Sequence, residues 1–309
     1  MSSNAHVPVL LGPVLEGLEI EQDGIYVDGT FGRGGHSSEI LKQLNASGRL
    51  IAIDRDPQAI ASAPKTLTDD PRFELIRSEI AELAARIEEK RLTGRINGLL
   101  LDLGVSSPQL DEAERGFSFL RDGPLDMRMD PESGIPASEW LQKVAEKDLR
   151  RVLKQFGEET QAGRIARAIV MSRDGAAINT TLQLADIVAS VIPAHTRKKH
   201  PATKTFQAIR IFINNELKQV DQVLADSIHM LARRGRLCVI SFHSLEDRIV
   251  KRFMRAASRE SEQYRGMPNV PAEFQPQLRQ IGKAITASAD EIAVNVRARS
   301  ARLRITERL

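Results

Sequence analysis

The chain has 309 residues, of which 41% are hydrophobic and 28% are charged. At roughly 100–200 residues per domain, this length predicts one large domain or two, and the composition excludes disordered and collagen-like chains. No apolar run approaches the ~20 residues that a bilayer span needs, and MSSNAHVPVLLGP at the start lacks the basic segment and cleavage site of a secretory signal. We therefore expect a cytoplasmic protein with no membrane partner.

The distribution of charge along the chain indicates which kind of partner the protein binds. The 44 Lys and Arg residues against 41 Asp and Glu give a net charge of only +3, but the cations are unevenly spread. Residues 187–215 contain no carboxylate, and residues 297–309 are rich in arginine; such stretches can neutralise a phosphate backbone or simply form a solvated face. We predict RNA contacts from the first stretch, at Arg197, Lys198, Lys199 and Lys204.

The histidines and the single cysteine do not indicate a metal site. Cys238 lies in the apolar run RLCVISF, which predicts a core residue and excludes an internal disulfide. His195 and His200 have no metal-ligating partners at a suitable spacing. We therefore predict that no metal is bound.

The first hundred residues alternate short apolar runs with segments of helical spacing. The pattern predicts strands over 24–28, 48–53, 72–76 and 96–101, with helices over 37–44, 57–63 and 80–89. Strands that alternate with helices in this way indicate βαβ units and a parallel sheet.

After Asp102 the pattern changes. Residues 104–135 are rich in Gly, Pro, Ser and Asp and predict a long functional loop. Helical patterns follow over 137–147, 148–156, 158–171 and 181–191, then a long amphipathic stretch over 203–233, a strand over 236–242, a helix over 244–257 and a last strand over 302–306. We expect residues 1–107 and 214–309 to form a sheet domain and residues 108–213 an inserted helical domain.

A glycine-rich turn, DGTFGRGGH at residues 28–36, follows the first strand and opens a helix. Such a turn either lets a cofactor approach the backbone or is only a tight βα connection. Asp54 ends the next strand, where a carboxylate can accept the ribose hydroxyls of a nucleoside cofactor. The glycine-rich turn together with Asp54 favours a cofactor site over a tight connection alone.

The charges around this turn discriminate between cofactors. The third glycine of a dinucleotide fingerprint is replaced by Ser37, and the carboxylate of Asp28 does not suit a pyrophosphate. The sulfonium and ammonium groups of S-adenosylmethionine suit a pocket edged by Asp28, Asp54 and Asp102. No P-loop motif occurs. S-adenosylmethionine is therefore the cofactor that we expect.

Residues beyond two strand ends are candidates for the chemistry. We expect Asp102, Ser106 and Ser107 to position a methyl acceptor by hydrogen bonds, although a capping serine in an ordinary loop fits the same residues. His243 either takes up a proton near neutral pH or is a structural histidine. Ser244 followed by Asp247 predicts a capping box that starts a helix.

Six segments spread from residue 27 to 305 resemble a known family. They are VDGTFGRGGHS, AIDRDPQAI, LLLDLGVSSPQLD, HPATKTFQAIRI, VISFHSLEDRIVKRFM and NVRARSARLRI. They are similar to the bacterial 16S rRNA (cytosine-N(4))-methyltransferases, the MraW family. The resemblance implies methylation of the exocyclic amine of a decoding-region cytidine. It also implies an α/β fold, a Rossmann-like class I methyltransferase sheet domain with an inserted all-helical domain.

The resemblance also assigns site residues. It implies that Gly34, Gly35 and His36 contact the methionine part of the cofactor. It also implies that Asp54 contacts the ribose, and that Asp102 and Gln109 close the site near the sulfonium. Where the family often has an aromatic near the adenine, this chain has Ile80, which offers apolar contact without stacking. Stacking on the target base would come from Phe31, Phe117 or Phe119, each of which also fits a core position.

Two other functions fit parts of the pattern. A nicotinamide-dependent oxidoreductase uses the same fold class, and a non-catalytic rRNA-binding assembly factor would explain the basic stretches. The preferred hypothesis is a methyltransferase acting on 16S rRNA or the small ribosomal subunit, with the insert recognising the RNA. The sequence leaves a homodimer open.

Overall fold

The computed structural model describes residues 8–192, 200–260, 264, 271 and 274–309. The chain divides into two compact units, one formed by Met1–Gly104 with Leu217–Leu309 and the other by Val105–Glu216. We call them the sheet unit and the helical unit. The insert that we predicted from the sequence spans 108–213, and the helical unit spans 105–216.

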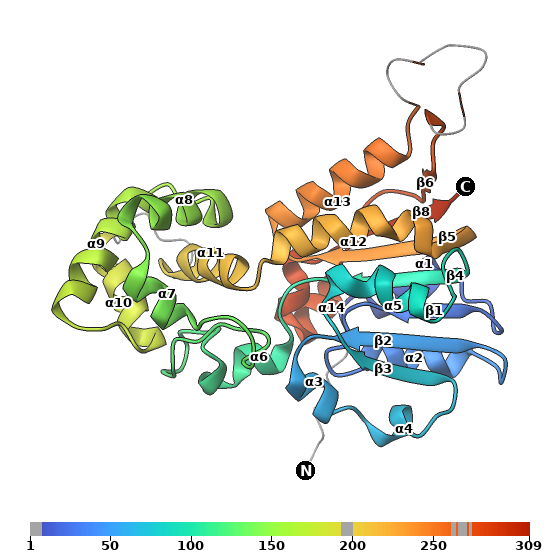
Figure 1. Cartoon of the computed structure of the whole chain (residues 1–309), viewed down its shortest axis with the longest axis horizontal. Coiled ribbons are helices and arrows are strands. Elements are labelled where there is room, and N and C mark those ends of the chain that lie inside the picture. The colour runs from blue at the N-terminus through green and yellow to red at the C-terminus, as the bar shows by residue number, and fades with distance from the viewer. Residues whose placement is uncertain (1–7, 193–199, 261–263, 265–270, 272–273) are drawn as a thin grey trace. The chain divides into compact units, whose positions relative to one another are not determined.

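The sheet unit is built on one eight-stranded sheet in the order β3-β2-β1-β4-β5-β8-β6, with β7 paired to β8 (Figure 1). The first five strands in this order are parallel, and β8 runs antiparallel to β5. The predicted fold class, a Rossmann-like sheet domain with a helical insertion, is confirmed. The strands are β1 (Ile25–Asp28), β2 (Arg49–Asp54), β3 (Phe73–Arg77), β4 (Ile96–Asp102), β5 (Leu231–Ser241), β6 (Leu278–Gln280), β7 (Ile285–Thr286) and β8 (Arg302–Arg308).

Alternate residues of the central strands enter two separate cores, one on each face of the sheet. Leu100 and Ile240 pack with helices α1 (Leu11–Leu18) and α2 (Gly35–Gln43). Leu99 and Val239 pack on the other face with α5 (Leu83–Glu89), α12 (Glu216–Met230) and α13 (Ser244–Ala257). Burial on both faces explains why these strands are continuous apolar runs. The other helical segments of this unit are α3 (Pro57–Ala61), α4 (Lys65–Thr68), η1 (Ile80–Glu82), α14 (Ala289–Val294) and η6 (Val296–Ser300).

Cys238 lies in the first of these cores with no exposed surface, as the sequence predicts. Burial raises the pKa of its thiol to about 12, so the thiolate that reacts with oxidants is suppressed.

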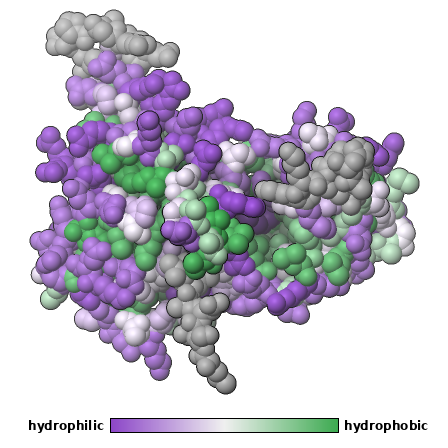
Figure 2. All heavy atoms as spheres, turned by 180° about the vertical axis from the view of Figure 1, so that it is seen from behind, coloured by the Kyte–Doolittle hydropathy of each residue, from purple (hydrophilic) through white to green (hydrophobic). Residues whose placement is uncertain are grey.

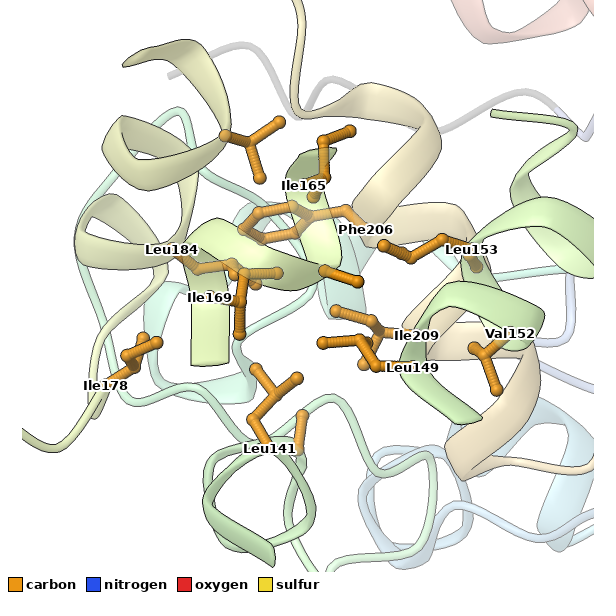
Figure 3. Packing of buried hydrophobic residues seen from close by; sticks show 14 of the residues in the cluster. Leu141, Leu149, Val152, Leu153, Ile165, Ile169, Ile178, Leu184, Phe206 and Ile209 are labelled. Atoms are coloured by element: carbon orange, nitrogen blue, oxygen red, sulfur yellow. The ribbon is translucent and has the colours of Figure 1, made fainter. Parts of the chain in front are cut away.

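The helical unit has its own core. Side chains from α7 (Ala137–Lys143), α8 (Glu146–Gly157), α9 (Ala162–Gly175), α10 (Thr181–Val191) and α11 (Thr203–Ile213) converge in it, as Figure 3 shows for Leu141, Leu149, Ile169, Leu184 and Ile209. The helices predicted over 136–191 are therefore confirmed.

The structure refines two expectations about the segments after Asp102. The loop predicted over 104–135 contains the short helix α6 (Ser107–Asp111) and the turn η2 (Ala113–Arg115). The amphipathic stretch over 203–233 contains two helices, because α11 ends before Asn214 and α12 begins at Glu216. The residues that follow Met230 already belong to β5.

Buried hydrogen bonds explain the break between α11 and α12. The Asn214 side chain is 1% exposed and bonds two backbone groups of a distant loop, donating to the Met127 carbonyl (2.7 Å) and accepting from the Met129 N–H (2.7 Å). Asn215 then adopts a left-handed conformation with φ of 52°, which Asn tolerates better than most residues. A bond to residues far away in sequence therefore ends the helix.

Among the described residues, no helix combines the length and the apolar composition needed to cross a membrane. Figure 2 shows one face of the molecule as mainly hydrophilic, with smaller hydrophobic patches between the charged side chains.

Candidate active site

The glycine turn joins the carboxyl ends of three neighbouring strands. Gly29 N–H donates to the Leu100 carbonyl of β4 (2.9 Å), and Phe31 N–H donates to the Ile53 carbonyl of β2 (2.9 Å). The parallel register places Asp28 beside Ala52 and Leu100. The carboxylates that end β1, β2 and β4 therefore stand at one edge of the sheet, where open α/β sheets bind their ligands.

Glycine is required at two positions of this turn for packing within the protein. Gly34 has φ of 73°, and a Cβ there would lie 2.7 Å from atoms of Phe31 and Leu67. A Cβ at Gly35 would lie 2.5 Å from Pro8. These contacts explain the glycines without a ligand, so the predicted contact of Gly34 and Gly35 with the methionine part of the cofactor stays a prediction.

Asp28 organises the turn. It is 1% exposed, and its carboxylate accepts hydrogen bonds from the Ser37 hydroxyl (2.7 Å) and the Thr30 N–H (3.1 Å). Burial raises its pKa. We expected this carboxylate to edge the cofactor pocket, but the structure directs it into the protein. Ser37, which replaces the third glycine of a dinucleotide fingerprint, is its partner.

Asp54 ends β2 and bonds both the glycine turn and the segment that follows β2. Its Oδ2 accepts the Gly32 N–H (2.8 Å) and its Oδ1 accepts the Asp56 N–H (2.9 Å). Burial raises the pKa of Asp54 to about 6. Each carboxylate oxygen has a second lone pair, so the side chain can accept further hydrogen bonds from a ligand while it holds the turn.

Asp102 ends β4 and has an unsatisfied oxygen. Its Oδ1 is buried and, within the described ranges of the chain, has no hydrogen-bond partner. Its Oδ2 lies 3.7 Å from Nδ1 of His36, and its N–H donates to the Thr30 hydroxyl (2.6 Å). Burial raises the pKa of Asp102 to about 6, with the charge of His36 opposing this rise. An unpaired buried acceptor costs free energy, and a bound donor or cation would relieve that cost.

His36 is held on both sides of its ring. Nε2 lies 3.0 Å from the Val9 carbonyl, which only accepts, so that nitrogen carries a proton. In a neutral ring Nδ1 is then an acceptor facing Oδ2 of Asp102. The 3.7 Å between Nδ1 and Oδ2 is too long for a hydrogen bond, but it places the His36 ring beside the Asp102 carboxylate. The predicted contact of His36 with the methionine part of the cofactor stays a prediction.

The structure adds two residues that sequence reasoning did not select, Thr30 and Ser37. Thr30 bonds to both Asp28 and Asp102, and Ser37 bonds to Asp28. Both lie inside or next to the glycine motif, so their position was the available signal. Their partners lie up to 72 residues away, and local patterns do not reveal such distant pairing.

Ile80 begins η1, just after β3, and is half-buried against the core that contains Val27 and Ile53. Nearby, the Ser78 N–H donates to the Asp54 carbonyl (3.0 Å), which connects this segment to β2. The predicted contact of Ile80 with the adenine stays a prediction.

Three predicted site residues belong to the helical unit. Ser106 precedes α6 and Ser107 begins it. The buried Gln109 accepts the Ser106 N–H through Oε1 (3.0 Å), the arrangement of a capping box. The capping role that we weighed for these serines is therefore present at Ser106. The roles of Ser106, Ser107 and Gln109 toward a ligand stay predictions.

The three candidate stacking aromatics differ in burial. Phe31 is 3% exposed and packs on Phe73 at 5.9 Å between ring centroids, and Phe117 is 6% exposed. Their core assignment is confirmed. Phe119 is only partly buried and stacks on His200, with ring centroids 4.3 Å apart.

His243 is the N-cap of α13. Its Nδ1 accepts the Glu246 N–H (3.4 Å), and the Glu246 carboxylate accepts the His243 N–H (3.3 Å). The capping box that we predicted between Ser244 and Asp247 is wrong by one residue. Asp247 instead accepts from Arg304 of β8 (2.7 Å). These bonds favour the structural reading of His243.

A pair of substitutions separates the two readings of His243. We expect His243→Ala to lower the free energy of unfolding by about 1 kcal/mol, because the N-cap acceptor is lost. His243→Asn keeps such an acceptor and should match the wild type in both urea unfolding and methyl transfer. A stable His243→Asn protein with more than tenfold slower transfer would instead assign His243 to proton removal.

Most of the predicted RNA contacts cannot be placed. Arg197, Lys198, Lys199 and the nearby His195 lie outside the described residues. Lys204 is exposed on α11, and its ammonium donates to the Glu158 carbonyl at the end of α8 (2.9 Å). The RNA contacts of these residues stay predictions.

Comparison with known proteins identifies relatives over nearly the full chain. The chain is 55% identical over 307 residues to Ribosomal RNA small subunit methyltransferase H of Shewanella baltica, which covers 99% of this chain and 98% of the relative. The protein of the same name from Shewanella loihica is 54% identical with the same coverage. A solved structure of a methyltransferase homologue from Pyrococcus horikoshii is 11% identical, with a TM-score of 0.44 over 98% of this chain and 67% of that one.

The family model described as the MraW methylase family matches residues 3–309. Neither this match nor the names of the relatives supports a nicotinamide-dependent oxidoreductase or a non-catalytic assembly factor. The glycine turn, the edge carboxylates and the helical insertion all lie within the matched range. The chain therefore belongs to the MraW methylase family.

Proposed function

We propose that this protein uses S-adenosylmethionine to methylate the exocyclic N4 amine of a cytidine in small-subunit rRNA. The observation that carries the proposal is the unpaired oxygen of Asp102, beside the glycine turn. This buried Oδ1 has no hydrogen-bond partner among the described residues. The names of the 55% and 54% identical relatives support the rRNA substrate. The choice of the cytidine N4 amine comes from the resemblance of the sequence motifs to the family of cytosine-N(4) methyltransferases.

The carboxyl edge of the sheet fits the cofactor by charge. When bound, S-adenosylmethionine supplies an activated methyl group on a cationic sulfur. The Asp54 carboxylate would accept the ribose hydroxyls while it keeps its bonds to Gly32 and Asp56. The Asp102 carboxylate would face the positive charge, which compensates the burial that raises its pKa to about 6.

The residues also account for the proton that the reaction releases. Transfer forms a bond from N4 to the methyl carbon and breaks the bond from sulfur to that carbon, which leaves the amine with a surplus proton. Asp102, with its pKa near 6 and with His36 behind it, can hold this proton and pass it to solvent. Side chains that hydrogen-bond the acceptor would contribute mainly by positioning it. We assign this role to Ser106 and Ser107, with Gln109 closing the site.

We assign RNA recognition to the helical unit. A cytidine amine in a stacked helix cannot reach a buried methyl donor, so the target must be unpaired or flipped out, at a cost of a few kcal/mol. Contacts from Lys204 and from the basic segment 197–199 would offset that cost by neutralising phosphates. The cytoplasm remains our prediction for the compartment, and a homodimer remains compatible with the sequence.

Nucleoside mapping tests the proposal directly. Small-subunit rRNA from cells that lack this protein should lose N4-methylation at one cytidine, and the purified protein with S-adenosylmethionine should restore it. Calorimetry should show binding of S-adenosylmethionine and none of NAD. Unchanged methylation in the deletion strain would contradict the proposal.

A further inference from the structure

A second candidate binding site lies on the sheet unit, where α13 packs against β6 and β8 (Figure 1). A pocket of about 370 Å³ opens there, and none of its lining residues is acidic. Its floor includes the buried side chains of Met254 and Ile305. Five cations line it, namely Lys251, Arg255, Arg259, Lys283 and Arg304. We call it the α13 pocket.

The cations of the α13 pocket are largely uncompensated. Arg304 is paired with Asp247 (2.7 Å). Lys251, Arg255 and Lys283 are exposed, and none of them has an ion pair within the part of the chain that the structure describes. Some cations elsewhere on the same unit do have partners: Arg86, for example, bonds to both Glu82 and Glu89. The pocket therefore concentrates positive potential.

The spacing of these cations opposes stability when the pocket is empty. Lys251 and Arg255 are four residues apart on α13, and Arg259 follows four residues later, just beyond the end of the helix. Like charges at this spacing repel one another across one helix face and cost a few tenths of a kcal/mol per pair. Bound anions would remove the repulsion.

The dimensions of the cationic row favour a polymer over a single anion. The helical part of the row formed by Lys251, Arg255 and Arg259 runs to the end of α13 at Ala257 and spans ~9 Å along the axis. Successive phosphates of one strand advance only ~3.4 Å along a duplex. One inorganic phosphate cannot meet the whole row, but a short run of phosphates can.

We propose that the α13 pocket binds the phosphate backbone of the rRNA substrate, as a contact surface on the sheet unit in addition to the helical unit. This inference rests on the proposed function, since it takes RNA to be the substrate. Phosphate contacts fix the register and orientation of a nucleic acid without reading its sequence. The pocket thus orients the RNA and leaves the choice of base to the reaction site.

A triple substitution tests this role against a matched control. Lys251→Gln with Arg255→Gln and Lys283→Gln removes three charges from the pocket. Arg49→Gln with Arg95→Gln and Arg233→Gln removes three exposed charges from elsewhere on the same unit. Anisotropy with a labelled 16S rRNA fragment, over a range of salt concentrations, measures Kd for both proteins and the wild type.

We expect the pocket variant to bind the RNA roughly 10- to 100-fold more weakly at low salt. Its salt slope should be shallower by about 2, because each single-strand phosphate that the protein neutralises contributes ~0.7 to the slope. The control should stay within about twofold of the wild type, because it shares only the change in net charge. Both proteins should bind S-adenosylmethionine with wild-type affinity in calorimetry. The control should unfold in urea as the wild type does, and the pocket variant should be slightly more stable, because the repulsion between positions 251 and 255 is removed.

Four results would overturn the inference in distinguishable ways. Equally weakened binding in the pocket variant and the control would reduce the effect to net charge. Loss of inorganic phosphate or nucleotide binding with unchanged RNA affinity would make the pocket a small-anion site. A wild-type protein that binds no rRNA would overturn the proposed function together with this inference, whereas tight wild-type binding with an unaffected pocket variant would overturn the pocket alone.

Discussion

The Asp102→Asn protein should transfer methyl groups at least roughly 100-fold more slowly than the wild type, within the range of ~10²–10⁴ typical of a positioned general base. Asn keeps the shape of the side chain and leaves the backbone bond to Thr30 in place. It removes the negative charge and the proton acceptor beside His36. The loss should therefore appear mainly in kcat, with a smaller change in the KM for RNA.

The same substitution should stabilise the ligand-free protein at neutral pH. Burial raises the pKa of Asp102 from 3.8 to about 6 in the folded state. Between those values the folded protein binds more protons than the unfolded chain, so its free energy of unfolding falls as the pH rises through this window. The Asp102 side chain is 25% exposed, so solvent screens part of this shift. The expected gain in the free energy of unfolding on substitution by Asn is on the order of 1–3 kcal/mol.

Urea unfolding of the ligand-free proteins at two pH values checks this sign. The Asp102→Asn protein should be more stable than the wild type near pH 7.5, and the difference should largely disappear near pH 3, where the Asp102 carboxyl of the wild type is mostly protonated in both the folded and the unfolded state. Asp221→Asn, at an exposed carboxylate on α12, is the matched control and should show neither effect. A variant less stable at pH 7.5 that still transfers at the wild-type rate would remove Asp102 from the site.

Asp54→Ala should weaken S-adenosylmethionine binding by roughly 100-fold or more. Two charge-assisted hydrogen bonds to the ribose, at roughly 1.5–3 kcal/mol each, account for this loss. The Gly32 and Asp56 N–H groups also lose their acceptor, so the glycine turn loosens at the same time. Asp54→Asn keeps one acceptor oxygen and should have an intermediate affinity.

The binding should also depend on pH through Asp54. Burial raises its pKa to about 6, and only the ionised carboxylate accepts bonds with both oxygens. The affinity of the wild type for S-adenosylmethionine should therefore fall as the pH drops below about 6. The affinity of Asp54→Ala should change less over the same range. Calorimetry from pH 5 to 8 measures both, with Asp69→Ala, at an exposed carboxylate, as control. Unchanged affinity of Asp54→Ala would contradict the ribose assignment.

Local patterns in the sequence determined the architecture of this protein. The alternation of apolar runs and helical segments before Asp102 placed β1 to β4, and the strictly helical patterns after Pro136 placed the insertion. These features depend on neighbouring residues, because periodicity and turn chemistry act within a few positions. The family motifs lie on the same elements. The short strands β6 and β7 were missed, because two or three residues carry too little pattern.

Only the tertiary structure decided which polar groups remain available for chemistry. Asp28 and Asp102 both end apolar strands, and the apolar runs before them do not distinguish them. Ser37 and Thr30 satisfy Asp28, whereas Oδ1 of Asp102 is left without a partner among the described residues. Thr30 and Ser37 lie only two and nine residues from Asp28, but it is the fold that brings their donors within about 3 Å of its carboxylate, and a buried polar group takes whichever partner lies within that distance.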